Sequence, residues 1–355
     1  MKLIELHILQ SFPVTCLNRD DVGAPKSAVF GGEPRARVSS QCWKRAIRTY
    51  ANELKPESFG GQRGHFVAEP LQAELEALGV EAKAAEKAAH AVVESIGKRD
   101  SKFKEGHKSS VALYLSNQEL KGIAQSIAAE AAEGKKIDVK RGAIKKAISA
   151  AQPRDIADIA IFGRMVADDH SLSLEGAGMF SHALSTHRVS NEIDFFSAVD
   201  DLKPEDSAGA GHIGTLEFNA ACYYRYVGVN LDLLADENHL GHLDADTQTE
   251  ILDAFVRSAI HAVPNARHNS MLGHNPPSAI LGSIRTGQPL SLANAFEQPI
   301  RKDNGFVAPS IKAMREHHDS LTRIYGNAGQ DCWLDTTRSD SLDLDGFIKE
   351  LLAHV

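Results

Sequence analysis

The sequence predicts an α+β fold in which a sheet is interrupted by a helical insertion. Residues Lys2 to Leu9 alternate weakly between apolar and polar side chains, and apolar side chains from Leu216 to Leu231 share one parity, as in half-buried strands. Between them, residues from about Ala68 to Ala151 are dominated by Ala, Glu, Lys and Leu, which are strong helix formers. We therefore expect sheet-forming regions on either side of a mostly helical one.

The first elements follow from local signals. The first strand is expected to end before Pro13, and a loop rich in Asn, Asp, Gly and Pro follows to about Lys26. A helix is predicted from Ser39 or Ser40, both good N-caps, to about Leu54.

The remaining elements alternate between helix and strand. The helical insertion contains one strand-like break, "VALYL" at 111–115, and the β-branched apolar run from Asp155 predicts a return to the sheet. Later helices are predicted over 246–262, 310–324 and 341–353.

Composition restricts the class of protein. A chain of 355 residues with 43% hydrophobic and 24% charged residues has material for one large domain or two ordinary ones. No apolar run approaches the roughly 20 residues that cross a bilayer, and the first residues do not form a signal peptide, so we expect a cytoplasmic protein without a membrane partner. The four cysteines are far apart and form no CxxC pair, which favours reduced thiols over disulfides or a zinc site.

A basic segment stands out in this acidic chain. The net charge is -8, yet the stretch from Arg19 to Arg48 holds seven Lys and Arg and three acids, a local charge of +4. At 100° per residue, Gln41, Lys44, Arg45 and Arg48 share an arc of about 100° on the predicted helix, opposite its apolar side chains. A cationic face beside free helix N–H groups and the flexible Gly31-Gly32 pair is suited to a chain of phosphates, although a solvated face is the commoner meaning of such a pattern.

Two other patterns favour ordinary structural roles. The run from Gly209 to Gly214 fits GxGxxG, but it opens a predicted strand rather than a helix, so its glycines are better explained as hinges than as a dinucleotide site. The sixteen histidines include no HExxH motif, and we expect no metal or other cofactor.

Five blocks of sequence resemble the CasC family, the backbone subunit of the type I-E CRISPR surveillance complex Cascade, in the RAMP superfamily. They are "CLNRDDVGAPKSAVFGGEPRARVSSQCWKRAIR" at 16–48, "GRM" at 163–165, "HALSTHRVSNEIDFFSAVDDL" at 182–202, "GTLEFNAACYYRYVGVNL" at 214–231 and "LSLANAFEQPIRKDNGFVAPS" at 290–310. The blocks occur in the family's order. The region from about Gly60 to Ala150 resembles the family least.

The resemblance implies a hand-shaped molecule. A palm with a modified RRM or ferredoxin-like sheet is expected at 1–58, 152–186 and 216–355, the last part including the C-terminal helices. Helical fingers are expected at 59–151 and a β-hairpin thumb at 187–215. Several copies would polymerise along the CRISPR RNA, and each thumb would kink the guide.

The resemblance also implies which residues bind RNA. The expected contacts with the guide backbone are Arg19, Lys26, Ser39, Gln41, Lys44, Arg45 and Arg48. Met165 would pack at the kink, and Arg301 and Lys302 are weaker candidates. Glu33-Pro34 stands where the family often has basic residues, so no phosphate contact is assigned there.

A second basic cluster lies in the expected fingers. In the family a lysine-rich face of the fingers holds double-stranded target DNA by non-specific charge, as expected of phosphate contacts. A solvated helix face is the alternative. The corresponding residues are Lys135, Lys136, Lys140, Arg141, Lys145 and Lys146.

The resulting hypothesis is a non-enzymatic, multi-copy scaffold that presents guide RNA for pairing with target DNA. Its partners would be CRISPR RNA, target DNA, further copies of itself and subunits of the CasA, CasB, CasD and CasE types. One alternative is a metal-dependent ribonuclease of the RAMP superfamily that uses Asp20 or Asp21. Another is an RNA-binding regulator that forms no assembly.

Overall fold

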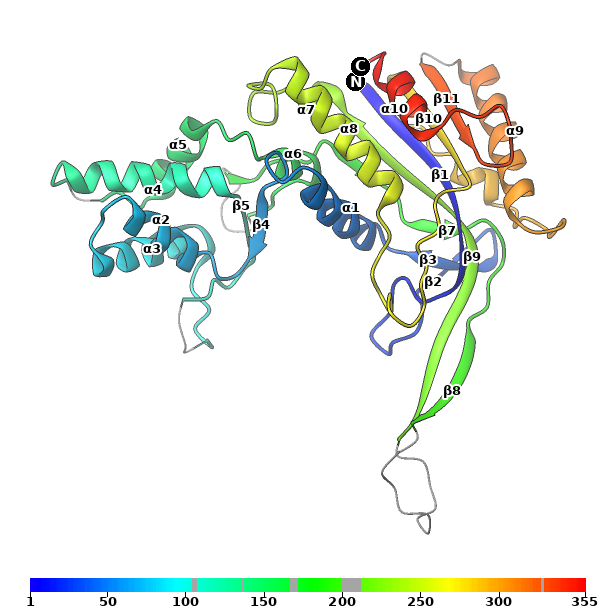
Figure 1. Cartoon of the computed structure of the whole chain (residues 1–355), viewed down its shortest axis with the longest axis horizontal. Helices are drawn as coiled ribbons and strands as arrows, with labels where there is room; N and C mark the ends of the chain where they lie inside the picture. Colours follow the sequence, from blue (N-terminus) through cyan, green and yellow to red (C-terminus); the bar gives the residue numbers. More distant parts are fainter. Residues whose placement is uncertain (104–106, 136, 167–171, 199–211, 327–328) are drawn as a thin grey trace, which may run out of the picture. The chain divides into compact units, whose positions relative to one another are not determined.

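The computed structural model describes residues 1–103, 107–135, 137–166, 172–198, 212–326 and 329–355 (Figure 1). The chain divides into two compact units, with the boundary falling inside α1, β6, β9 and α8. The sheet unit comprises Met1–Tyr50, Met179–Gly228 and Val256–Val355, and the helical unit comprises Ala51–Gly178 and Val229–Phe255. Mixed helices and an antiparallel sheet confirm the α+β class. The bounds of palm, fingers and thumb remain predictions.

One nine-stranded sheet organises the sheet unit. Its path runs β11-β10-β1-β9-β7-β3-β2, and β6 and β8 each pair with β9. The strands are β1 Lys2–Thr15, β2 Ser27–Phe30, β3 Glu33–Val38, β6 Gly178–Phe180, β7 Ala183–Ser185, β8 Glu192–Ala198, β9 His212–Asn230, β10 Ala279–Thr286 and β11 Gln330–Asp335.

Strand β1 is longer than its sequence predicts. It continues through Pro13 to Thr15. The ladder with β10 ends at Leu9, so the missing N–H of Pro13 costs no hydrogen bond in that pairing. Strand β1 therefore carries the chain from the centre of the sheet towards the basic segment.

Helices of the sheet unit agree with the predicted ranges to within a few residues. They are α1 Ser40–Leu54, α8 Ala245–His261, η2 Ala293–Phe296, α9 Val307–Tyr325 and α10 Leu344–Leu352. Side chains of η2 and α9, among them Phe296 and Met314, pack with Leu9 and Tyr224 into one buried apolar cluster. This core holds the sheet beneath the helices.

The helical unit has its own core. Its helices are α2 Ala68–Ala77, α3 Ala82–Gly97, α4 Asn117–Ala132, α5 Arg141–Ala151, α6 Ala157–Phe162 and α7 Leu231–Leu234. Leu71, Val92, Leu113 and Ile123 belong to one buried cluster that joins four of its elements. The predicted strand-like break is confirmed as β5, Leu113–Ser116, and it pairs with β4, Gly61–Gly64, which the sequence pattern did not reveal.

One predicted element is wrong. The apolar run after Asp155 forms helix α6 rather than a strand. The carboxylate of Asp158 accepts hydrogen bonds from the N–H groups of Gly61 and Ile159 and from the Tyr114 hydroxyl, at 3.2, 3.0 and 2.7 Å. Periodicity does not separate a short buried helix from a buried strand, and these tertiary contacts decide the outcome.

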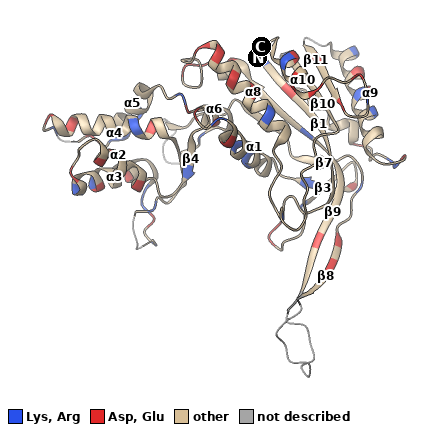
Figure 2. Ribbon diagram, in the orientation of Figure 1, with Lys and Arg blue, Asp and Glu red and all other residues tan. Residues whose placement is uncertain are grey.

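Strands β8 and β9 form an antiparallel ribbon in the segment expected to be a hairpin. Gly214 lies in β9 opposite Phe196, while Gly209 to Gly211, and with them the predicted hinge, fall outside the described residues. The ribbon carries acidic but no Lys or Arg side chains in its paired stretches, 192–198 and 212–218. The acids are Glu192, Asp194 and Glu217 (Figure 2).

The described ranges contain no helix that is long and apolar enough to span a membrane.

Candidate nucleic-acid interface

Helix α1 presents the predicted cationic face. Trp43, Ile47 and Ala51 are buried on its inner side, while Gln41 and Arg45 are exposed on the outer side. Lys44 and Arg48 are partly exposed. The Nζ of Lys44 lies 5.0 Å from the ring centroid of Phe180, and burial lowers the pKa of this lysine. The amphipathic pattern therefore gives the expected orientation of the helix.

The N-terminus of α1 is fixed by side chains. Ser39 is 8% exposed, and its hydroxyl accepts a hydrogen bond from the Cys42 N–H at 3.3 Å, so it caps the helix. The Ser40 N–H donates to Nδ1 of His182 at 2.9 Å. Ser39, predicted to contact RNA, thus already has a structural hydrogen bond in the isolated chain.

The loop before β2 presents Arg19 and Lys26. Asp20 organises this loop, because its Oδ1 accepts the backbone N–H groups of Val22 and Ala24 at 3.0 and 2.9 Å. Asn18 joins the loop to α1 by accepting the Ser39 N–H at 2.9 Å. Arg19 is exposed and Lys26 is partly exposed.

One cation of the loop and one of the helix act on the same side chain. Burial raises the pKa of the Cys42 thiol, and the charges of Lys26 and Arg45 act in the opposite direction. Both cations therefore lie within electrostatic range of one side chain. Neither forms an ion pair with a described residue, so each remains available to an anionic partner.

The double glycine has a structural role that differs from the predicted one. Gly31 and Gly32 have φ of 60° and 76° and form the turn between β2 and β3. A Cβ on Gly31 would lie 1.7 Å from the carbonyl oxygen of Glu297, whereas Gly32 faces open space. The close backbone approach at Gly31 is therefore made by the chain itself.

Arg35 lies inside the protein despite belonging to the basic segment. It is 0% exposed and donates to the carbonyl oxygens of Ser185, Phe296 and Glu297 at 2.9, 2.9 and 3.1 Å. Burial lowers its pKa. Its role is to join β3, β7 and η2.

Glu33 and Pro34, which follow the double glycine, both contact the residues just before β8. The carboxylate of Glu33 lies 3.6 Å from Nε of Arg188, and Pro34 accepts the N–H of Val189 at 3.1 Å. This stretch therefore contacts the segment that leads into β8.

Arg301 and Lys302 are exposed but are not brought to α1. They lie in the loop that precedes α9, which Figure 1 shows well apart from α1. The cationic surface consequently consists of Arg19, Lys26, Lys44, Arg45 and Arg48.

Met165, the residue predicted to pack at the kink in the RNA, has a strongly exposed side chain. Its side chain is 82% exposed although it lies between Arg164 and Val166, which are 8% and 5% exposed. Arg164 donates to both carboxylate oxygens of Glu119 at 2.7 and 2.9 Å and to the Leu172 carbonyl at 2.8 Å.

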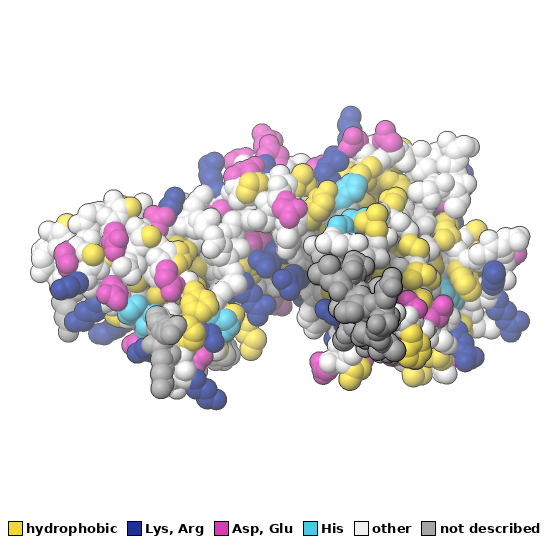
Figure 3. All heavy atoms as spheres, turned by 60° about the horizontal axis from the view of Figure 1, so that its bottom comes forward, with side chains coloured by type: hydrophobic (Ala, Val, Ile, Leu, Met, Phe, Trp, Pro, Cys, Tyr) yellow, Lys and Arg dark blue, Asp and Glu magenta, His cyan; other side chains and the backbone are white. Residues whose placement is uncertain are grey.

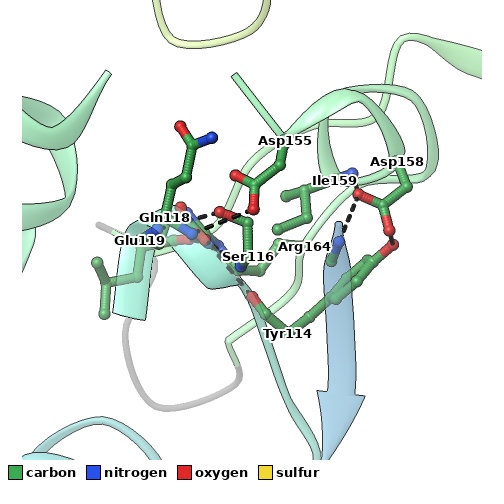
Figure 4. Close-up of polar contacts among 10 residues, drawn as sticks. Tyr114, Ser116, Gln118, Glu119, Asp155, Asp158, Ile159 and Arg164 are labelled. Atoms are coloured by element: carbon green, nitrogen blue, oxygen red, sulfur yellow. Dashed lines mark hydrogen bonds and ion pairs between the residues drawn. The ribbon is translucent and has the colours of Figure 1, made fainter. Parts of the chain in front are cut away.

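The segment that carries Met165 is held by the contacts of the neighbouring Arg164. Figure 4 shows Arg164 beside Glu119, Ser116 and Tyr114, with the carboxylates of Asp155 and Asp158 on the neighbouring segment. Arg164 and Leu174 also exchange backbone hydrogen bonds at 2.9 and 2.7 Å. These contacts fix the backbone on either side of Met165, while its exposed side chain keeps its rotamer freedom.

The described residues of the predicted basic cluster in the helical unit have different surroundings. Lys135 pairs with Glu133, and Lys136 lies outside the described residues. Arg141 donates to the carbonyl of Ser95 at 2.5 Å, and Lys140 is exposed just before α5. Lys145 lines a cavity with Glu119, Asp236 and Glu237, whereas Lys146 lines a groove with Glu130 and Asp138. The two adjacent lysines of α5 therefore line different hollows, each of which also has acidic residues in its lining.

Charges on the surface are intermixed. Figure 3 shows basic and acidic side chains side by side over much of the visible face. Among the cations of α1 and of the loop before β2, Lys26 and Arg45 form no ion pair with a residue in the described ranges.

Metal ligation finds no support within the described parts of the chain, where no three His, Cys, Asp or Glu side chains are grouped to hold an ion. The spaced histidines His239 and His242 hydrogen-bond the carbonyls of Glu175 and Pro153 at 2.8 and 3.1 Å. Of the two residues of the ribonuclease alternative, Asp20 accepts backbone hydrogen bonds within its loop through Oδ1, and Asp21 is exposed.

Comparison with solved structures places the fold in a class. The chain is 28% identical to a chain of a "CRISPR RNA-guided surveillance complex, pre-nicking", with 99% of both chains covered and a TM-score of 0.83. A chain of another "CRISPR RNA-guided surveillance complex" shares the fold at 23% identity, with a TM-score of 0.65 over 99% of both chains. The protein is thus an α+β protein with the fold of chains from such complexes.

The family follows from the sequence. The chain belongs to the family of CT1975-like proteins, whose sequence model matches residues 4–351. This agrees with a Cas protein of the Cascade kind. No curated protein matches the chain.

Proposed function

We propose that this protein is a non-enzymatic backbone subunit of a Cascade-type, RNA-guided surveillance complex, with the role of a type I-E CasC subunit. It binds the sugar-phosphate backbone of CRISPR RNA and presents guide segments for pairing with target DNA. Copies of the chain line up along the RNA beside the other Cascade subunits. Similarity to chains of CRISPR RNA-guided surveillance complexes supports this role.

One observation carries the proposal: Lys26 of the loop before β2 and Arg45 of α1, neither paired with an acid among the described residues, act on one side chain. Lys26 and Arg45 both influence Cys42, and Arg19 leads into the same loop. Arginine forks and ammonium groups without acidic partners suit phosphate oxygens, which all nucleotides share. The surface is therefore suited to RNA of any sequence, as guide binding requires.

Met165 supports the kinking part of the proposal. A bound RNA strand exposes base faces, and an apolar side chain inserted between them separates one base from its neighbour. Because the Arg164–Glu119 pair is buried, Met165 stays in place against that stacking energy. Its role is to mark the displaced nucleotide.

The β8–β9 ribbon fits a contact that does not depend on cations. Ile193 and Phe195 are 62% and 74% exposed, and the paired residues carry acids without bases. In our proposal the ribbon closes over the RNA through apolar contacts with bases or sugars, since its carboxylates would repel phosphates.

The test is co-expression of the chain with a CRISPR RNA, followed by sizing and analysis of the RNA. The proposal expects several copies on one RNA of defined length with repeat-derived ends, and no shortening of that RNA with Mg²⁺ or Mn²⁺. A single copy on RNA would contradict the scaffold and favour a regulator. Metal-dependent cleavage that is lost in Asp20→Ala or Asp21→Ala would favour the ribonuclease alternative.

A further inference from the structure

The loop between α8 and β10, residues 262–278, lies against the far end of β1. Figure 1 shows this yellow loop beside the blue loop that precedes β2. The amide of Gln10 donates to the Asn275 carbonyl at 2.7 Å, and the amide of Asn275 donates to the Ser11 carbonyl at 3.2 Å. A Cβ on Gly273 would lie 2.8 Å from the side chain of Thr15. Close packing therefore fixes the loop on the strand that leads to Arg19.

Arg267 occupies an unusual backbone position in this loop. Its φ is 53°, a left-handed conformation, and its carbonyl accepts the N–H groups of Ser270 and Met271 at 3.1 and 2.8 Å. The conformation costs about 1 kcal/mol for a residue other than glycine. The tight turn thus holds the arginine at a defined point.

The guanidinium of Arg267 has no acidic partner among the described residues. Its Nε is buried and makes no hydrogen bond, while the side chain as a whole is partly exposed. The guanidinium of Arg267 is therefore held by packing, and no acidic side chain among the described residues balances its charge. An uncompensated, partly desolvated arginine is costly unless an anion completes it.

Arg267 and Arg19 lie close to the same buried side chain. Burial raises the pKa of the Cys16 thiol, while the charges of Arg267 and Arg19 act against this rise. Asp20 and Glu217 also act on this thiol, but Asp20 is hydrogen-bonded within its own loop and Glu217 to Asn191. Two arginines from distant parts of the sequence are therefore both within electrostatic range of Cys16.

Two histidines lie in the same loop as Arg267. His268 and His274 are exposed, and their rings meet edge to face with centroids 4.9 Å apart. Ring edges and faces of this kind pack against the riboses and bases of a single strand. The loop thus presents the guanidinium of Arg267 and, within the same 262–278 segment, the exposed rings of His268 and His274.

We propose that Arg267 binds a backbone phosphate of the same RNA strand as Arg19, so that the 262–278 loop forms a second part of the RNA-binding surface. This inference rests on the proposed function and adds to it a residue outside the resemblance. The ligand is a single-stranded RNA phosphate, recognised by the fork of the guanidinium. His268 and His274 contact the adjoining nucleotide.

Binding of the assembled complex to RNAs of unrelated sequence, measured over a range of salt concentrations, tests the proposal. Arg267→Gln is expected to weaken binding roughly tenfold. It should also reduce the slope of log affinity against log salt by about 0.7, the value for one phosphate of a single strand. Arg267→Lys keeps the charge without the fork and should retain the slope with part of the affinity. Arg323→Gln, an exposed arginine on α9, is the matched control and should change neither.

Denaturation curves identify any variant that does not fold, in which case Arg267→Lys and His268→Ala with His274→Ala carry the test. Unchanged affinity and slope in Arg267→Gln would overturn the inference. If the α1 cations prove necessary while Arg267 does not, the inference fails and the proposed function stands. If neither set matters, the proposed function itself fails.

Discussion

The guanidinium of Arg225 lies over the ring of Trp43, 4.2 Å from its centroid, deep in the sheet unit. Its Nε and Nη2 donate to Oε1 of Gln10 at 3.2 and 3.0 Å, and its Nη1 donates to the carbonyl of Ala259 at 2.7 Å. Burial lowers the pKa of Arg225 to about 9. One buried cation thus ties β9 to β1, to the last turn of α8 and to the inner face of α1, whose outer face carries the candidate RNA contacts.

We expect Arg225→Met to destabilise the protein by about 2–4 kcal/mol. The substitution leaves the Gln10 amide and the α8 carbonyl without their donor and removes the stacking on Trp43. Chemical denaturation measures the loss, with Arg323→Met on the surface of α9 as the control. A loss no larger than that of the control would show that this contact does not hold α1.

Gly31 and Gly32 provide a matched pair of substitutions in one turn. Gly31→Ala is expected to destabilise by about 3 kcal/mol or more, because its methyl group would overlap the Glu297 carbonyl. Gly32→Ala faces open space and should cost about 1 kcal/mol for its positive φ. RNA binding by the folded fraction should be unchanged in both. Selective loss of binding in folded Gly31→Ala would restore the glycine as a phosphate-approach site.

His318 should make stability depend on pH. Its Nε2 lies 3.2 Å from Oδ2 of Asp331, and this hydrogen bond raises its pKa above 6.5, with burial opposing and Asp319 assisting. His7 differs from His318, because burial lowers the pKa of His7 to about 3, whereas the pKa of His318 is raised.

A raised folded-state pKa means that the stabilisation from His318 is fully present below about pH 6.5 and is lost as the pH rises through the folded value. The free energy of unfolding should therefore fall above pH 6.5 by an amount that His318→Gln removes. Measurement at constant ionic strength over that range checks the sign. An identical fall in the variant would contradict the assignment.

Met165 is expected to shape the RNA rather than the protein. Met165→Ala should leave the thermal midpoint unchanged because the side chain is 82% exposed. It should also lower the chemical reactivity of the displaced bases along bound RNA. The control is Ile324→Ala, another exposed apolar side chain, at 62% in the last turn of α9. A reactivity pattern that is the same in both variants would remove Met165 from the kink.

Much of the fold follows from local sequence signals. The amphipathic period placed α1, and its caps and apolar face are where Ser39 and Trp43 predict them. The run at 157–162 was misassigned because a short apolar segment has no diagnostic period, and its conformation depends on Asp158, Gly61 and Tyr114.

The site was less predictable than the fold for a related reason. Charge counting treats Arg35, Arg45 and Arg267 alike, yet only tertiary structure buries Arg35 among carbonyls. Arg267 is 248 positions after Arg19, and sequence spacing does not bring the two together. The lysines of α5 show the opposite effect. Lys145 and Lys146 are adjacent in the sequence, but they line different hollows in the fold.

The central claim is that the cations of α1 bind the RNA backbone without regard to sequence. The most direct measurement is the salt dependence of RNA affinity for Lys44→Gln/Arg45→Gln/Arg48→Gln, using two unrelated RNAs. Its control is a triple substitution of exposed cations elsewhere in the sheet unit, at Lys312, Arg323 and Lys349. We predict equal weakening for both RNAs and a slope reduced by about 2, corresponding to three phosphates. Wild-type affinity and slope, or a loss confined to one RNA, would contradict the account.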